Sequence, residues 1–194
     1  MSRGLALAVV LLIVSCDGPD GGPGPDEGGG SGLGSVVLRQ GEVPAELEAG
    51  PGGPIGSIRD VLPPRQRFPN LPPLPDGLRE GFVEGFRRSF AGPDGGAASS
   101  TVVRMADVTT ASALVGYLRL LPVGGQAAAP EEVPATGLGE EGYGWHLLVP
   151  ENESSGYVWR SGDLVASVTL SGPVGAAGTG TCLSLAERVD GRLG

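Results

Sequence analysis

His146 is the only histidine of the chain and the first residue at which acid–base chemistry would be sought. It follows Trp145 and lies close in sequence to Glu140 and Glu141, so a carboxylate could orient its imidazole as a general base. No nucleophile stands beside it at motif spacing. On a strand, His146 would point to the face opposite Tyr143 and Trp145. Two interpretations follow: a surface or packing histidine, which we favour, and the base of a hydrolase.

Cys182 carries a second group that could react, because it lies near the start of a predicted helix. A helix N-terminus can lower the pKa of a thiol and make the thiolate nucleophilic. The residue also shares one helical stripe with Leu185 and Val189, and a buried free cysteine behaves as a small hydrophobic residue. We therefore predict a structural role for Cys182.

Four aromatic residues gather in one short stretch of the chain: Tyr143, Trp145, Tyr157 and Trp159. Each tyrosine–tryptophan pair is separated by two positions, which places both of its rings on one face of a strand. If the faces of the two pairs coincide, the rings form a ligand platform suited to a sugar or another molecule with an apolar face. The alternative, which we favour, is that the rings belong to the core beneath a helix.

Composition argues against several other kinds of site. The chain has no lysine, which removes Schiff-base chemistry, and one histidine with two cysteines is too few for the usual zinc site. The motifs of the nucleophile elbow, the phosphate loop and dinucleotide binding are all absent from the sequence. A net charge of −9 argues against nucleic acid as a partner, since nucleic-acid binding needs a basic surface. We expect no metal, no cofactor and no catalysis.

The first sixteen residues have the pattern of an export signal. Arg3 precedes an uninterrupted apolar run over residues 5–14. Such a run is too short to cross a membrane as a helix, which needs about 20 residues, but it matches the apolar core of a secretory signal peptide. An acidic tract rich in glycine and proline begins at Asp17, and this abrupt change is unlike a strand or helix of a folded core.

The residues Ile13-Val14-Ser15-Cys16 resemble a bacterial lipobox. In that family the cysteine receives diacylglycerol on its thiol and becomes the mature N-terminus. The resemblance implies that residues 1–15 are a signal peptide, that Cys16 is lipidated, and that the membrane is a partner through this anchor. Two acyl chains hold a protein stably at a membrane, whereas one holds it reversibly. With Cys16 acylated, Cys182 has no partner for an internal disulfide.

Composition divides the remaining chain into a tether and a domain. Residues 16–34 hold the lipidated cysteine and a tract of Gly, Pro and Asp that cannot bury enough apolar surface to fold, so we predict a disordered tether. Residues 35–194 are predicted to form a single domain. Within it, residues 50–75 are rich in glycine and proline and predict extended coil without regular structure.

Hydrophobic periodicity predicts the elements of that domain. Phe82, Phe86 and Phe90 lie four apart, which fits a helix or one face of a strand, and nearby glycines favour a helical turn followed by a strand. A helix capped by Thr109 or Thr110 is predicted to end near Pro122, followed by a polar loop over 122–142. The remaining predicted elements are a strand at 36–38, a hairpin of the strand from 84 with 101–105, a meander of 143–149, 157–160 and 164–170, and a helix over 181–190.

These elements predict an α+β fold, with an antiparallel sheet (hairpin plus three-stranded meander) packed by two helices on one face. The order of elements resembles small lipoprotein and sensor-type domains of high-GC Gram-positive bacteria. The residues that carry this resemblance are the acidic loop 138–141, the meander motif 159–165 and the terminal helix segment 185–189. The resemblance transfers no catalytic residue to this chain.

The sequence therefore predicts a lipoprotein of the cell membrane that faces the extracytoplasmic side. We expect it to act as a non-catalytic binding or accessory module of the cell envelope. Two alternatives stay open: a carrier of an apolar envelope ligand, which needs a cavity of matching size, and a hydrolase using His146, which needs a serine or aspartate within hydrogen-bond reach in a cleft.

Overall fold

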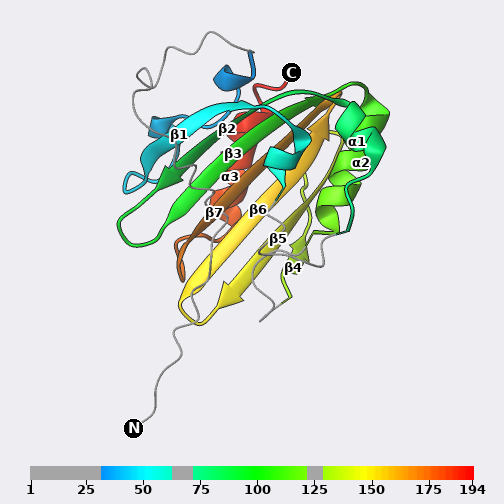
Figure 1. Ribbon diagram of the computed structural model, residues 1–194. Coiled ribbons are helices and arrows are strands. Elements are labelled where there is room, and N and C mark those ends of the chain that lie inside the picture. The colour runs from blue at the N-terminus through cyan, green and yellow to red at the C-terminus, as the bar shows by residue number, and fades with distance from the viewer. Residues whose placement is uncertain (1–31, 63–71, 122–128) are drawn as a thin grey trace.

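The protein is described from a computed structural model, over residues 32–62, 72–121 and 129–194. These residues form a seven-stranded antiparallel sheet with the strand order β1-β2-β3-β7-β6-β5-β4 (Figure 1). The predicted hairpin is β2–β3 and the predicted meander is β5–β6–β7, so the α+β class with an antiparallel sheet is confirmed. The strands are β1 Glu48–Ile55, β2 Phe82–Ala91, β3 Ala97–Met105, β4 Glu131–Val133, β5 Glu141–Val149, β6 Asn152–Ser161 and β7 Leu164–Pro173.

Pairing between β3 and β7 joins the hairpin to the meander, from Ala97 opposite Ser171 to Arg104 opposite Leu164. This contact links residues that are 60–74 positions apart in sequence and makes one continuous sheet. At the β6–β7 turn, Gly162 has a φ of 59°, a left-handed conformation that glycine adopts without steric cost. The turns are therefore local, whereas the β3–β7 pairing depends on the whole domain.

The two longer helices lie on opposite faces of the sheet, which corrects the prediction that both cover one face. α2 (Val108–Arg119) packs on Val165 of β7, whereas α3 (Thr179–Asp190) packs on the neighbouring residues Ala166 and Val168. Successive side chains of a strand point to opposite faces, so these contacts place the helices on different sides. In Figure 1, α3 lies behind the strands, while α1 (Asp76–Glu80) and α2 lie together at one end of the sheet.

Asp107 caps α2, two to three residues before the predicted cap at Thr109 or Thr110. Its carboxylate accepts a hydrogen bond from the backbone N–H of Thr110 at 2.7 Å, which satisfies a donor that the first turn of a helix leaves free. The same hydrogen bond lowers the pKa of Asp107 below its ordinary value. α3 begins at Thr179, close to the predicted start.

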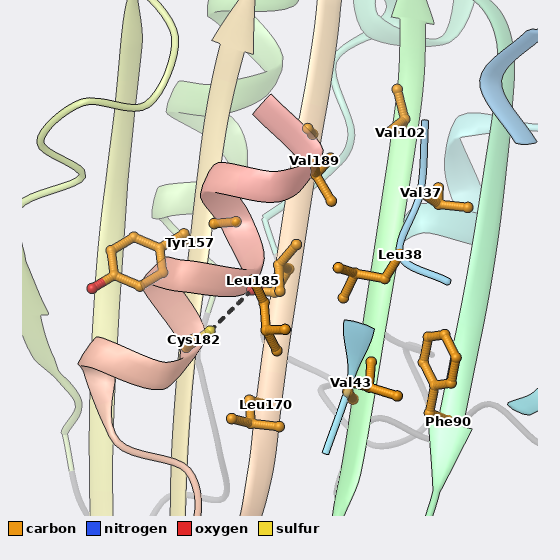
Figure 2. Close-up of a cluster of buried hydrophobic side chains, with 14 of the residues drawn as sticks. Val37, Leu38, Val43, Phe90, Val102, Tyr157, Leu170, Cys182, Leu185 and Val189 are labelled. Carbon is orange, nitrogen blue, oxygen red and sulfur yellow. Dashed lines mark hydrogen bonds between the residues drawn. The ribbon is translucent and has the colours of Figure 1, made fainter. Parts of the chain in front are cut away.

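Residues 33–47 share the α3 face of the sheet, where a strand at 36–38 was predicted. The segment contains short 3-10 turns, Gly32–Ser35 and Gln40–Glu42, and no strand. Its apolar side chains nevertheless enter the core beside α3 (Figure 2), and the buried members are Leu33, Val37, Leu38, Val43 and Leu47. Arg192, after α3, fastens the segment by donating hydrogen bonds to the carbonyls of Val36 and Val37. The core therefore includes Leu33, which composition had placed in the tether.

Two edge strands occur where coil was predicted. β1 overlaps the start of the glycine- and proline-rich stretch 50–75, and a 3-10 turn over Ile58–Val61 follows it. Its Pro51 falls at a register shift between Ala49 and Gly52, where a missing N–H costs little because β1 pairs on one side only. β4 likewise occurs within the predicted loop 122–142, paired with β5. Residues 63–71 and 122–128 lie outside the described residues.

Candidate functional site

His146 lies opposite a serine across the β5–β6 hairpin. The two-residue turn at 150–151 pairs Val149 with Asn152, and counting back places His146 opposite Ser155. The imidazole Nδ1 is 3.0 Å from the Ser155 hydroxyl, and Nε2 is 3.6 Å from a carboxylate oxygen of Glu153. A serine, a histidine and an acid thus stand together at one end of the sheet. Ser155 and Glu153 are not among the residues predicted from the sequence, although the length of the turn is enough to give this pairing.

The hydrogen bonds of this cluster are not those of an activated nucleophile. The Ser155 hydroxyl donates its only proton to the carbonyl of Ala177 at 2.7 Å, so it must accept the hydrogen bond from His146. A catalytic serine instead gives its proton to the imidazole. Ser155 is also fully buried, with an exposed fraction of 0%, so a substrate carbonyl has no access to its oxygen.

Glu153 holds the loop before α3 in place through hydrogen bonds to its backbone. One carboxylate oxygen accepts hydrogen bonds from the backbone N–H groups of Gly175 at 2.9 Å and Ala177 at 3.2 Å. The other oxygen faces the imidazole of His146. Together with Ser155, the acid satisfies backbone groups at the start of the α3 layer, which is a structural role for the cluster.

The acidic residues that precede His146 in sequence bind elsewhere. Arg160 donates hydrogen bonds to Glu140 at 2.7 Å and to Glu141 at 3.3 Å. The backbone N–H of Gly162 also binds Glu140, and these bonds hold the pKa of that carboxyl below its ordinary value. Proximity in sequence was therefore misleading, because the acid that faces His146 comes from the next strand.

Cys182 is part of the core beneath α3. Its exposed fraction is 0%, and Figure 2 shows its side chain among the apolar residues between α3 and the sheet. Burial raises the pKa of the thiol to about 12, so the thiolate is scarce at neutral pH. Burial in the apolar layer therefore affects the pKa of the thiol more strongly than the helix N-terminus does. The thiol has the structural role that was predicted for it.

The four aromatic residues divide between the two faces of the sheet. Tyr157 and Trp159 lie on the α3 face, with exposed fractions of 3% and 0%, whereas Tyr143 and Trp145 pack toward α2. The two pairs therefore do not form the single platform that coinciding faces would produce. Tyr143 is buried, which raises the pKa of its hydroxyl well above the ordinary value. Three of the rings serve as core residues, and Trp145 is only half-buried.

Trp145 lies over Gly156 of the neighbouring strand. A Cβ atom added at Gly156 would stand only 2.6–2.7 Å from three atoms of the indole ring, Cε2, Cζ2 and Nε1. The indole therefore lies directly against the backbone of β6 at this point. The close approach requires glycine at this position.

A small cavity lies at the opposite end of the β2–β3 hairpin from α2. It has a volume of about 120 Å³ and is lined by Leu47, Pro93, Leu170 and Pro173, among others. Small-molecule pockets usually measure roughly 300–1,000 Å³. This cavity is therefore too small to support the carrier interpretation, in which an acyl chain would be enclosed.

The described part of the chain holds neither a metal-binding cluster nor a membrane-spanning helix. Its histidine, cysteine and acidic side chains form no group of three or more that could hold a metal ion. Within residues 32–62, 72–121 and 129–194, no helix has the length and apolar character needed to cross a membrane. Cys16, the predicted lipidation site, lies outside the described residues, as do the predicted signal peptide and nearly all of the tether.

Comparison with known proteins identifies a fold relative but no family. No family model matches the chain, and no curated protein matches it in sequence. Among solved structures, the chain is similar to the extracellular domain of PknH from Mycobacterium tuberculosis, with a TM-score of 0.55 and 12% sequence identity. The similarity covers 83% of this chain and 94% of that domain. The similarity shows a shared fold. Mycobacterium tuberculosis is a high-GC Gram-positive bacterium, and the order of elements in this chain resembles lipoprotein and sensor-type domains of that group.

Proposed function

We propose that this protein is a membrane-anchored extracytoplasmic lipoprotein that acts as a non-catalytic binding or accessory module of the cell envelope. The observation that carries the proposal is the fold. Most of this chain shares the fold of a domain that is described as extracellular. The apolar leader and Cys16 support export and anchoring independently, because they lie outside the part of the chain that shares the fold with the extracellular domain.

Anchoring is tested by metabolic labelling with a fatty acid in the bacterial host. The full chain should incorporate label and sediment with membranes, and Cys16→Ser should lose the label. Cys182→Ser is the matched control, because it removes the only other cysteine of the chain and should keep the label. Label that persists in Cys16→Ser would refute lipidation at this residue.

The absence of catalysis is tested at the cluster that a hydrolase would use. The hydroxyl of Ser155 gives its proton to the carbonyl of Ala177, so we expect no reaction with a fluorophosphonate probe, which labels activated serines. His146→Ala should likewise leave any biological role of the protein intact. Labelling of the folded protein that disappears in both Ser155→Ala and His146→Ala would establish the hydrolase interpretation instead.

A further inference from the structure

One half of the α2 face of the sheet is lined by hydroxyl groups from four adjacent strands. We call this surface the hydroxyl face. Strand register and the alternation of side chains place its residues on the same side as Val165 and Val103, which contact the α2 layer. Its hydroxyl residues are Ser89 of β2, Ser99 and Thr101 of β3, Ser167 and Thr169 of β7, and Ser154 of β6.

The helices of the described chain leave the hydroxyl face uncovered. α1 and α2 lie at the other end of this side of the sheet, and α3 lies behind it (Figure 1). Ser89, Ser99, Ser167 and Thr169 are only half-buried, whereas Thr101 and Ser154 are buried. A polar surface on central strands, away from the helices, is unusual because the centre of a sheet is normally covered by apolar packing.

The hydroxyl groups retain capacity to bind a ligand. Ser99 and Thr169 share one hydrogen bond at 2.8 Å across β3 and β7, which leaves the pair with one donor and further acceptor sites. Ser154 forms no side-chain hydrogen bond with the described residues, and its hydroxyl oxygen is not among the enclosed unpaired atoms, so it can bind a ligand or water.

Trp145 bounds the hydroxyl face on the β5 side. It stands in the same register row as Gly156, Thr169 and Ser99, which spans three strand spacings, or about 14 Å. Its position opposite Gly156 places the indole on the same side of the sheet as the hydroxyls, and the ring is only half-buried. An aromatic plane beside a row of donors and acceptors suits a pyranose ring, which has an apolar face and an equatorial rim of hydroxyls.

Charge indicates which kind of sugar would bind. The chain has 22 acidic residues, but none is contributed to the described hydroxyl face by β2, β3, β7 or β6. The nearest carboxylate is that of Glu132 on β4, opposite Trp145, and it forms an ion pair with Arg119. The cation of the hydroxyl face, Arg87, donates hydrogen bonds to Thr101 at 3.1 Å and to the carbonyl of Val61. A surface whose neighbouring carboxylate and arginine both already bind the protein is complementary to an uncharged ligand.

We propose that the hydroxyl face binds a neutral oligosaccharide, with one sugar ring stacked on Trp145 and others hydrogen-bonded to Thr169 and Ser99. This inference rests on the proposed function as a binding module and specifies the class of ligand. The row is long enough for a short oligosaccharide rather than a single sugar. Binding needs no lipid anchor, so it can be measured on the purified chain.

The experiment titrates the full chain, purified in a detergent without a sugar headgroup, with maltotriose, mannotriose and tri-N-acetylglucosamine. Calorimetry gives the Kd, and tryptophan emission reports on Trp145, since the other tryptophan is fully buried. We expect at least one trisaccharide to bind. Thr169→Val and Trp145→Ala should each weaken binding about tenfold, as the loss of one hydrogen bond or one stacked ring predicts.

Ser100→Ala is the matched control, because Ser100 neighbours Ser99 on β3 but points to the α3 face. Its Kd should stay at the wild-type value, because the buried Ser100 hydroxyl lies on the opposite side of the sheet from the proposed site. Circular dichroism verifies that each variant is folded. If Trp145→Ala does not fold, Thr169→Val still tests the site, because valine has nearly the same shape as threonine. Failure of the folded wild-type chain to bind any of the three sugars would overturn the proposal. Binding that Thr169→Val leaves unchanged would also overturn it.

The sugar titration and the labelling of Cys16 test different claims, so one can fail while the other succeeds. A chain that is labelled with fatty acid but binds no neutral sugar retains the proposed function and loses this inference. A chain that binds sugar through Trp145 but carries no lipid keeps the site and loses the anchor.

Discussion

Replacing Leu38 with alanine tests whether the segment at 33–47 is part of the folded domain. Leu38 has an exposed fraction of 0% and packs on the α3 face of the sheet with Phe90 and Leu170 (Figure 2). Truncating a fully buried leucine costs roughly 2–5 kcal/mol, from lost burial and from the cavity that remains. A loss of about 3 kcal/mol would lower the Tm of a domain of this size by about 6–12 °C.

The assay is urea unfolding of the full chain, followed by circular dichroism and by tryptophan emission. The matched control is Leu120→Ala, because Leu120 follows α2 with an exposed fraction of 71% and should change stability by no more than about 0.5 kcal/mol. If Leu38→Ala unfolds at the same urea concentration as Leu120→Ala, the segment does not pack on the sheet, and our account of the α3 layer is wrong.

Three further predictions concern polar and titratable groups. Ser100→Ala should raise stability by about 1 kcal/mol, because the buried Ser100 hydroxyl has no partner in the described chain; a lower unfolding midpoint would contradict this. In a Cys16→Ser chain, Cys182 should react with a thiol reagent at pH 8 far more slowly when folded than when unfolded, because burial raises its pKa to about 12; equal rates would refute its burial. The backbone N–H of Gly162 helps to lower the pKa of Glu140, so its contribution to stability is complete above the ordinary glutamate range and is lost as pH falls through the lowered pKa. Stability measured against pH should show this acid loss in the wild type, and an equal loss in Glu140→Gln would refute it.

Local pattern was enough to predict the hairpin, the meander and the terminal helix. In β7, Leu164, Ala166, Val168 and Leu170 alternate with polar residues, and that period of two specifies a strand with one apolar face. The short turn at 150–151 also sets the register between β5 and β6. These features depend on neighbours in sequence, which is why composition and spacing were sufficient. The apolar leader ending at Cys16 is likewise a local signal, and its lipidation remains a prediction.

Tertiary structure alone decided which helix covers each face and which distant strands meet. The turn at 150–151 puts Tyr157 and Trp159 on the face opposite Tyr143 and Trp145, but the choice of α3 for one face and α2 for the other depends on the whole domain. The α3 face could accommodate residues 33–47 because α3 covers only part of the sheet, and no periodic pattern marks such an irregular segment. The pairing of Ser99 with Thr169 depends on β3 meeting β7 across some seventy residues. Long-range pairing of this kind forms because it lets both faces of the sheet be buried at once. That condition depends on distant segments of the chain, so no short stretch of sequence reveals it.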